Sequence, residues 1–377
     1  MKDHIILKSK QEEIRTDIYI CSDVIEDPHF EKLCQKLSRR YAVITDTNIG
    51  KLYGASLISF LKDLGLDATL HLFQAGEKSK SRTTKASLED ELFEAGHGRE
   101  SCFIAMGGGV TTDLVGFISA TFCRGVPYIS LPTSLLAMVD ASVGSKTGIN
   151  VSFGKNLIGA TYSPHAIFLD LSVLRTLSDE GMREGTAEII KHGLIERRSL
   201  FEMIDECIDK WNERDIPFMK KLIYESCQVK KKVVETDLKE HGMRRMLNFG
   251  HTIAHAVENI ENYKMPHGEA VALGMVVESL ISLKMKKIKE SEFDEIYQLL
   301  KSMNYNLSIS EKVTTEKMLE VMKYDKKAKG RVPRFVILDG IGKVETFKGA
   351  YCTTVDDSLL SEALGWMVAE FYRPSRG

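Results

Sequence analysis

Apolar and polar positions in the first half of the chain follow two alternating patterns. Short runs rich in β-branched and aromatic residues have the composition of buried strands, and segments with helical spacing lie between them, such as Phe30–Arg39 and Leu57–Leu64. The predicted strands are Asp17–Cys21, Tyr41–Asp46, Ala68–Phe73, Cys102–Met106, Pro127–Leu131 and Ala166–Asp170. This alternation predicts an α/β fold with a mainly parallel, doubly wound sheet, which binds ligands at the carboxyl ends of its strands.

From about Leu171 the pattern changes, and long amphipathic segments dominate. The helices predicted in this half are Glu184–Arg197, Phe218–Val234, Thr252–Asn262, Glu269–Lys284 and Glu290–Met303. Near the end, Arg334–Asp339 and Lys343–Phe347 flank a glycine-containing turn and predict a hairpin. One hydrophobic core seldom grows past about 250–300 residues, so a chain of 377 residues indicates two domains. We expect an α/β domain over 1–170 and a mostly helical domain over 171–377, with a cleft between them.

Composition and charge narrow the functional classes. The net charge is −2, from 51 basic and 53 acidic residues, so no global excess of charge points to nucleic acid or an anionic membrane. No apolar run reaches the roughly 18 residues that cross a bilayer, and the first residues are too charged for a signal peptide. The seven cysteines are scattered without a CxxC pair, which is typical of a reduced, cytoplasmic protein. A small anionic substrate is not excluded, because a local cationic pocket is compatible with a net charge near zero.

A glycine turn follows the strand predicted at 102–106. The residues Gly107–Asp113 read GGGVTTD and lead into an apolar helical pattern. Glycines let a backbone approach a ligand closely, and a helix N-terminus offers free N–H groups to a phosphate. The spacing differs from the GxGxxG fingerprint of dinucleotide-binding proteins. The turn is therefore either a phosphate-binding loop or a tight turn without a ligand. Thr45–Asn48 and Gly76–Lys80 follow other predicted strands and offer polar groups for ribose or phosphate.

A second candidate site combines histidine and glutamate. His251 and His255 lie four residues apart and share a helix face, His267 precedes another helix, and Glu188 lies inside a helical pattern. Two imidazoles and one carboxylate with an open position make a catalytic zinc-type set. The alternative is that these histidines are ordinary surface or core residues.

Cationic residues occur near this set in unusual settings. Lys146 and Lys155 lie in segments of small residues at 140–147 and 154–156, which we interpret as glycine-rich loops. Lys191 is one helical turn from Glu188, and Lys230 and Arg244 precede the histidine helix. Such charges beside metal ligands indicate recognition of phosphate or carboxylate. Because like charges repel, we expect a bound dianion to favour a closed cleft.

With these residues, the sequence resembles the dehydroquinate synthase family of the sugar phosphate cyclase superfamily over nearly its whole length. The motifs, in the family's order, are GGGVTTD at 107–113, PTSLLAMVDASVGSKTGIN at 132–150, GKNLIGA at 154–160, GTAEIIKHG at 185–193, LNFGHTIAHAVE at 247–258, MPHGEAVALGM at 265–275 and DKK at 325–327. The resemblance implies a Rossmann-like NAD-binding domain at 1–170 and a mostly helical metal- and substrate-binding domain at 171–377. It also implies NAD, a divalent metal (zinc or cobalt), a small anionic sugar-phosphate substrate and a cytoplasmic homodimer, with no nucleic-acid or membrane partner.

The resemblance assigns roles to individual residues of this chain. The implied metal ligands are Glu188, His251 and His267. The implied substrate pocket contains Asp140, Lys146, Asn156, Lys191, Lys230, Arg244, Asn248, His255 and a lysine of the Lys326-Lys327 pair, and Arg124 reaches the site of the neighbouring subunit. The implied NAD contacts are Asp46, Asn48, Glu77, Lys80, Gly108, Gly109, Val110, Asp113, Thr133, Ser134, Lys155 and Thr176.

The activity implied by the resemblance is conversion of 3-deoxy-D-arabino-heptulosonate 7-phosphate to 3-dehydroquinate and phosphate in the shikimate pathway. NAD is reduced and reoxidised in each turnover, and the enzyme is a carbon–oxygen lyase. Relatives that make valiolone-type cyclitols typically replace the residues at Asn248 and His255, so the presence of both favours dehydroquinate synthesis. The alternatives are another sugar phosphate cyclase, a metal-dependent NAD polyol dehydrogenase, and a catalytically inactive binding paralogue.

Three places depart from the family pattern. Ser145 stands where a glycine is frequent, Val151-Ser152 stands where a histidine and a proline often follow Asn150, and Glu184 stands where a small or amide residue is common. All three leave the chemistry residues intact, so we expect their effects in local loop geometry.

Overall fold

The computed structural model describes residues 15–324 and 332–373. Its main feature is a six-stranded sheet in which every neighbouring pair is parallel, in the order β1-β8-β5-β4-β2-β3. The strands are β1 (Asp17–Cys21), β2 (Arg40–Asp46), β3 (Asp67–Phe73), β4 (Cys102–Gly107), β5 (Tyr128–Pro132) and β8 (Ala166–Asp170). Each strand predicted from the sequence is present to within one residue, and the predicted α/β class with a parallel sheet is confirmed.

Helices cover both faces of this sheet because successive strand residues point to opposite sides. On β2, Tyr41 and Val43 pack with α1 (Pro28–Leu37) and α3 (Ala55–Asp63). The alternate residues Ala42 and Ile44 pack with α4 (Arg82–Glu94) and α5 (Gly109–Thr121). Strands buried on both faces need continuous apolar runs, which is why they were recognisable in the sequence.

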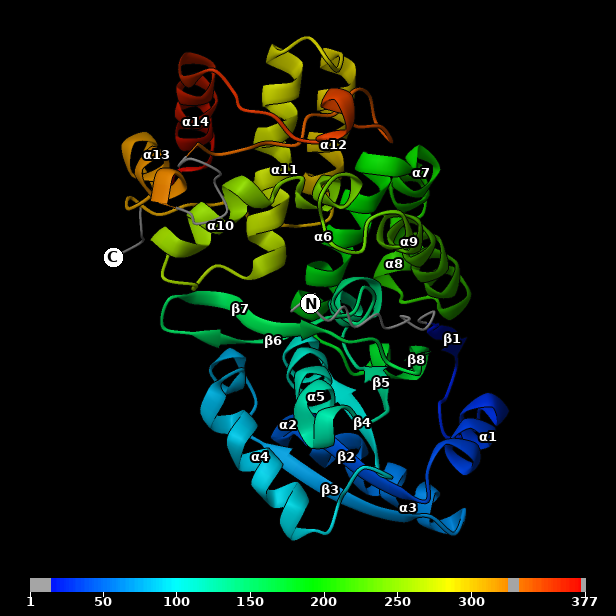
Figure 1. Cartoon of the computed structure of the whole chain (residues 1–377). Coiled ribbons are helices and arrows are strands. Elements are labelled where there is room, and N and C mark those ends of the chain that lie inside the picture. The colour runs from blue at the N-terminus through cyan, green and yellow to red at the C-terminus, as the bar shows by residue number, and fades with distance from the viewer. Residues whose placement is uncertain (1–14, 325–331, 374–377) are drawn as a thin grey trace, which may run out of the picture.

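The remaining part is mostly helical and lies on the other side of the molecule in Figure 1. Its longer helices are α6 (Asp179–Glu196), α7 (Arg198–Glu206), α9 (Ile216–Thr236), α10 (His251–Ile260), α11 (His267–Lys284), α12 (Glu290–Ser302), α13 (Thr315–Tyr324) and α14 (Asp357–Phe371). Their shared core also takes in Leu135, Met138 and Val143, which precede residue 171. The boundary at 170 stays a prediction. Among the described residues, no helix is long and apolar enough to cross a membrane.

A two-stranded antiparallel hairpin lies between the sheet and the helices in Figure 1. It is formed by β6 (Lys146–Val151) and β7 (Gly154–Thr161). The expectation of loops at 140–147 and 154–156 was therefore wrong for 146–147 and 154–156, which are strand residues. It was also wrong for 140–141, which end the helical segment Ala137–Ala141. Glycine is depleted in strands, so a segment rich in glycine is typical of a loop. In this hairpin, however, glycine permits β6 and β7 to pair closely, because a Cβ on Gly159 would lie 1.9 Å from the Thr147 carbonyl oxygen.

The hairpin predicted near the end of the chain forms only in part. The chain does reverse at Gly340-Ile341-Gly342, and the Asp339 amide donates to the Lys343 carbonyl at 2.8 Å. Leu338 and Val344 make an isolated antiparallel bridge. A second bridge joins Phe335 to Thr353, so no extended ladder forms between the two predicted strands.

Candidate functional site

Apart from Lys155, the residues expected to bind NAD lie at or after the carboxyl ends of five strands of the sheet. From β2 the chain proceeds to β3 on one side, and β4 then lies on the other side of β2, so the direction of winding reverses between β2 and β4. Asp46 and the glycine turn flank that reversal, the position where doubly wound sheets bind ligands. Glu77 and Lys80 follow β3, Thr133 and Ser134 follow β5, and Thr176 follows β8.

The glycine turn leaves the start of α5 open. A Cβ on Gly107 would lie 2.2 Å from Thr111 Oγ1, so this position has no room for a side chain. The N-cap of α5 is Gly108, which has no side chain to accept hydrogen bonds from the first N–H groups of the helix. On the neighbouring strand, one Asp46 oxygen accepts from the amides of Asn48 and Ile49 at 2.8 and 3.1 Å. Because its N-cap is a glycine, the first turn of α5, including Val110, is suited to contact an anion.

Polar contacts hold the other residues of this edge. Buried Lys80 pairs with Asp113 at 2.5 Å, and Asn150 of the hairpin donates to Glu77 at 2.6 Å. Thr176 and Tyr53 place their hydroxyl oxygens 2.5 Å apart. Lys155 differs, because it lies on β7 and faces the helical part, 4.0 Å from Glu258.

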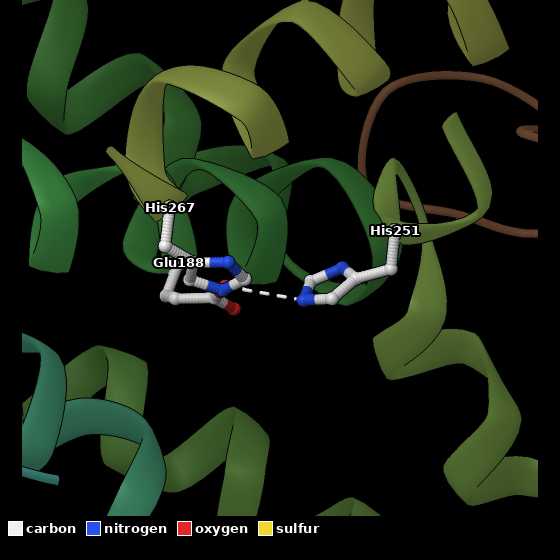
Figure 2. A group of neighbouring side chains, drawn as sticks. All are labelled: Glu188, His251 and His267. Atoms are coloured by element: carbon white, nitrogen blue, oxygen red, sulfur yellow. Dashed lines mark ion pairs between the residues drawn. The ribbon is translucent and has the colours of Figure 1, made fainter. Parts of the chain in front are cut away.

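The predicted metal ligands come together where α6, α10 and α11 meet. One ligand atom from each of Glu188, His251 and His267 lies within 4.8 Å of the other two. The Glu188 carboxylate is 3.4 Å from His251 Nε2 and 3.7 Å from His267 Nε2. Figure 2 shows both imidazole rings turned toward that carboxylate. A carboxylate with two imidazole nitrogens is a donor set that suits zinc or a similar divalent metal.

Charge compensation makes the buried carboxylate of Glu188 tolerable. Burial alone would raise the pKa of Glu188, but Lys191, His251 and His267 lower it well below its usual range. Burial alone would lower the pKa of His267, but hydrogen bonds to Glu188 and Glu258 raise it to about 10. Burial and the charge of Lys191 lower the pKa of His251. The cluster therefore holds an ionised carboxylate that attracts cations.

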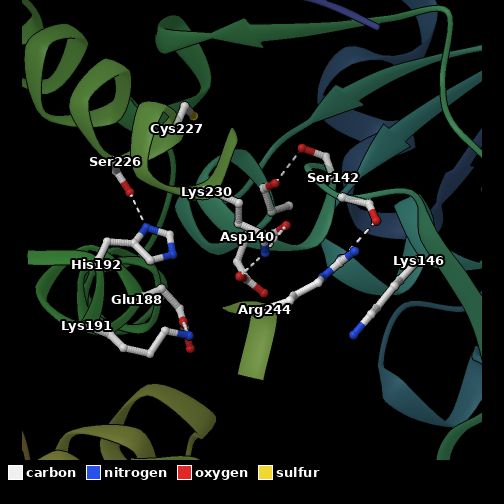
Figure 3. Close-up of polar contacts among 12 residues, drawn as sticks. Asp140, Ser142, Lys146, Glu188, Lys191, His192, Ser226, Cys227, Lys230 and Arg244 are labelled. Atoms are coloured by element: carbon white, nitrogen blue, oxygen red, sulfur yellow. Dashed lines mark hydrogen bonds and ion pairs between the residues drawn. The ribbon is translucent and has the colours of Figure 1, made fainter. Parts of the chain in front are cut away.

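A second group of potential ligands shares Glu188 with the first. Asp140, Glu188 and His192 also have ligand atoms within 4.8 Å of one another. The ammonium groups of Lys191 and Lys230 contact Glu188 and Asp140 there, as Figure 3 shows. Glu188 belongs to both groups, so its pairing with Lys191 does not distinguish them. Asp140, in contrast, is paired with Lys230 and belongs only to the second group, which favours the group with His251 and His267 as the metal site.

The cations expected to bind substrate already have partners, which are carboxylates for the three lysines and backbone carbonyl oxygens for Arg244. Lys191 contacts Glu188, Lys230 contacts Asp140, and Lys146 contacts Glu240. Arg244 is buried and donates to the carbonyl oxygens of Leu238 and Gly144 at 2.8 and 2.9 Å. The expected repulsion among these cations is thus offset within the site. An anionic substrate therefore meets cations that already have partners, and not a cluster of bare positive charges.

The other expected pocket residues lie in varied positions. Asn248 donates to Glu240 at 2.9 Å, and the His255 ring centroid is 5.4 Å from that of His251. The Asn156 amide donates to Asn150 at 2.9 Å, within the hairpin. Arg124 is exposed on the turn after α5. Lys326 and Lys327 lie outside the described residues.

The three departures from the family pattern have local explanations. Ser145 has φ 61°, a left-handed conformation that favours glycine, and its hydroxyl lies 2.6 Å from that of Ser163. Val151-Ser152 leads into the turn of the hairpin, next to a register shift between Ile149 and Val151. Glu184 lies against the start of α11, where a Cβ on Gly268 would be 2.5 Å from Glu184 Cα.

Sequence reasoning missed several carboxylates of this region. Glu240 contacts Lys146 and Asn248. Glu258 contacts His267, and Glu278 faces the backbone N–H groups at the start of α10. Glu258 belongs to the quoted motif at 247–258, but a helical spacing does not say which neighbour a carboxylate meets. Glu278 interrupts an otherwise apolar stretch of α11, and that interruption was the signal available for it.

Comparisons with known proteins identify relatives for both halves of the chain. Residues 70–184 match the family model "3-dehydroquinate synthase N-terminal", and residues 185–328 match "3-dehydroquinate synthase C-terminal". A 3-dehydroquinate synthase from Rippkaea orientalis is 40% identical over 84% of this chain and 87% of that protein. The 2-epi-5-epi-valiolone synthase ValA from Streptomyces hygroscopicus, with NAD⁺ and Zn²⁺ bound, has a TM-score of 0.87 at 25% identity and covers 97% of this chain and 99% of its own. A 2-deoxy-scyllo-inosose synthase with carbaglucose-6-phosphate, NAD⁺ and Co²⁺ has a TM-score of 0.82 at 24% identity, over 93% and 96%.

The buried carboxyl group of Glu278 generates a prediction about pH. It faces the backbone N–H groups of Gly250, Thr252 and Ile253 at the start of α10, although neither oxygen reaches hydrogen-bond geometry with a described group. Burial raises the pKa of Glu278 to about 8, and the three N–H groups offset only part of that rise. The folded protein therefore holds this proton more tightly than the unfolded chain, whose glutamate pKa is 4.5.

We predict that Glu278 lowers the free energy of unfolding as pH rises from about 4.5 to about 8, because the unfolded state releases the proton first. Glu278→Gln removes this titration while keeping the side-chain volume. Urea unfolding of both proteins, stripped of metal and nucleotide, should show the variant gaining stability relative to the wild type between pH 5 and pH 8. A difference that stays constant across this range would contradict the assignment.

Proposed function

The chain belongs to the 3-dehydroquinate synthase family, and on that premise we propose that it converts 3-deoxy-D-arabino-heptulosonate 7-phosphate to 3-dehydroquinate and phosphate. The observation that carries this proposal is the Glu188–His251–His267 cluster, built around a buried carboxylate and placed beside the ion-paired Lys191 and Lys230. The reaction belongs to the shikimate pathway of aromatic amino acid biosynthesis, and its phosphate-eliminating step makes the enzyme a carbon–oxygen lyase.

NAD is the cofactor that suits the carboxyl edge of the sheet. The fit rests on the glycine turn, where a Cβ at Gly107 would clash and where the start of α5 has no side-chain cap. Gly108, Gly109 and Val110 would hold the pyrophosphate, and Asp46 lies at the end of the adjacent strand. When bound, NAD supplies reversible hydride transfer without net redox change. The ion pair of Lys80 with Asp113 keeps a buried cation next to the proposed phosphates.

A divalent metal, zinc or cobalt, suits Glu188, His251 and His267. The fit rests on the donor set and on the histidine contacts, because each ring has its Nδ1 engaged and its Nε2 directed at Glu188. When bound, the metal supplies Lewis acidity toward substrate oxygens. The chain itself orients the two rings and keeps Glu188 ionised through Lys191.

We propose that substrate binding replaces the carboxylate partner of Lys146 and leaves the two buried ion pairs in place. Lys146, Lys191, Lys230 and Arg244 come from β6, α6, α9 and the segment before α10, so they reach the site from both halves of the chain. A phosphate or carboxylate of the substrate would take the place of Glu240 at Lys146, the most exposed of the three ion-paired lysines at 58%. The buried pairs Lys191–Glu188 and Lys230–Asp140 would position their ammonium groups without leaving their carboxylates.

The activity is tested by following phosphate and absorbance at 340 nm together. Purified protein with NAD, Zn²⁺ and the heptulosonate phosphate should release phosphate stoichiometrically with substrate consumed and accumulate no NADH. A polyol dehydrogenase would accumulate NADH without phosphate. An inactive paralogue would give neither signal, and either of these results would overturn the proposal.

The metal assignment predicts different effects for two histidines on the same helix face. His251→Ala removes a ligand and should lose most of the bound metal together with activity. His255→Ala should keep much of its metal and lose activity through the substrate pocket. Elemental analysis of the purified variants measures this contrast, and equal metal content in His251→Ala and the wild type would refute the ligand set.

We propose that the active form is a cytoplasmic homodimer in which Arg124 reaches the partner's site. Arg124 is exposed, and the consecutive residues Cys123, Arg124 and Gly125 have φ of 49°, 71° and 117°. Cys123 and Arg124 are not glycines, so their positive φ angles cost free energy, and such strain is frequent at functional sites. The strain supports a functional role for Arg124, and its exposure leaves the side chain accessible to a partner subunit.

Subunit mixing tests this arrangement. Arg124→Ala and Lys191→Ala proteins, each inactive alone, should regain activity when mixed, because a heterodimer holds one site with both residues. Replacing the Lys191→Ala partner by the double variant Arg124→Ala/Lys191→Ala should abolish the rescue. A monomer in analytical ultracentrifugation at assay concentration would rule the arrangement out.

A further inference from the structure

The imidazole of His267 has a carboxylate on each side. Its Nε2 faces Glu188 at 3.7 Å, and its Nδ1 lies 3.3 Å from Glu258 Oε1. Glu258 is 4% exposed and comes from α10, whereas His267 opens α11. Through Glu258, helix α10 therefore contacts the proposed metal ligand His267 of helix α11.

The two histidines of the cluster are oriented by different means. His251 Nδ1 lies 3.1 Å from the carbonyl oxygen of Phe249, a backbone acceptor two residues earlier in the chain. His267 follows Pro266 at the first turn of α11, and its side chain is 30% exposed. Its Nδ1 contact is with a side chain instead. The orientation of His251 is thus fixed by the backbone, but that of His267 depends on one replaceable carboxylate.

Glu258 is itself held on a second side. Lys155 Nζ of β7 lies 4.0 Å from Glu258 Oε1 and 4.2 Å from the centre of the Tyr263 ring. Tyr263 follows α10 closely, so this lysine is bracketed by a carboxylate and an aromatic face from one region. The contact ties the hairpin, where we place part of the nucleotide site, to the helix that orients the metal ligand.

We propose that Glu258 is a positioning residue that accepts the Nδ1–H of His267 and so directs the Nε2 lone pair toward the metal. This inference rests on the ligand set of the proposed function. A carboxylate behind a ligating histidine fixes the tautomer and ring orientation and increases ligand basicity, and its loss typically costs about 10–100-fold in metal affinity.

Two conservative variants separate the hydrogen bond from the charge. Glu258→Asp keeps the negative charge but withdraws it by one methylene, so the carboxylate no longer reaches Nδ1. Glu258→Gln loses the charge but keeps an oxygen at the same reach, which can still accept from Nδ1–H. We expect Glu258→Asp to lower Co²⁺ affinity by about 10–100-fold and Glu258→Gln to lower it by less than about tenfold.

The experiment titrates the metal-free full chain with Co²⁺ against a competing chelator and records the visible absorption of the bound ion, after circular dichroism has shown that each variant is folded. The matched control is Glu261→Gln at the end of the same helix, because Glu261 accepts from the Ser310 amide at 2.9 Å and should leave affinity and spectrum unchanged. Weakened binding and an altered spectrum in Glu258→Asp, with partial retention in Glu258→Gln, would support the proposal. Wild-type affinity and spectrum in Glu258→Asp would overturn it alone, whereas a wild-type protein that binds no Co²⁺ would overturn the ligand set as well.

Discussion

A single buried carboxylate, that of Glu188, constrains the whole helical half. Its side chain is 1% exposed, and an ionised group so placed is costly unless positive or donating groups surround it. Lys191 comes from the same helix, but the two histidines come from α10 and α11, so these helices must converge on α6. Small residues permit the approach: a Cβ on Gly274 of α11 would lie 1.9 Å from the Gly250 carbonyl oxygen that precedes α10. The metal site and the packing of these helices therefore depend on the same contacts.

The same carboxylate couples the metal cluster to the substrate and nucleotide regions. Lys191 shares Glu188 with the histidines, and Lys230 holds Asp140 of the π-helical segment Ala137–Ala141. That segment meets the nucleotide edge, since a Cβ on Gly109 would lie 3.4 Å from Ala141 Cβ. Ligand atoms of Asp140 and Glu188 lie within 4.8 Å of each other, so neighbouring residues link the start of α5 to Glu188. The proposal that residues from both halves of the chain act on one substrate rests on this proximity.

The sequence predicted features that a local pattern determines. Buried parallel strands need continuous apolar runs, and the i, i+4 spacing of His251 and His255 is visible without a fold. The hairpin β6–β7 was missed because Gly148 and Gly159 weaken the strand pattern while permitting close pairing. The partner of Lys146 was also missed, because Glu240 is 94 residues away in the sequence and only tertiary packing joins the two. The family resemblance indicated which residues to expect in the site. Only the structure shows which carboxylates pair with the lysines among them.

We propose that one divalent metal binds to Glu188, His251 and His267, and not to the overlapping group that includes Asp140 and His192. A crystal structure of the Zn²⁺-loaded protein, with anomalous data collected on both sides of the zinc absorption edge, tests it directly. We expect one strong peak about 2.0–2.2 Å from a Glu188 oxygen and from the Nε2 atoms of His251 and His267. A peak between Asp140, Glu188 and His192, or full zinc occupancy elsewhere, would contradict it.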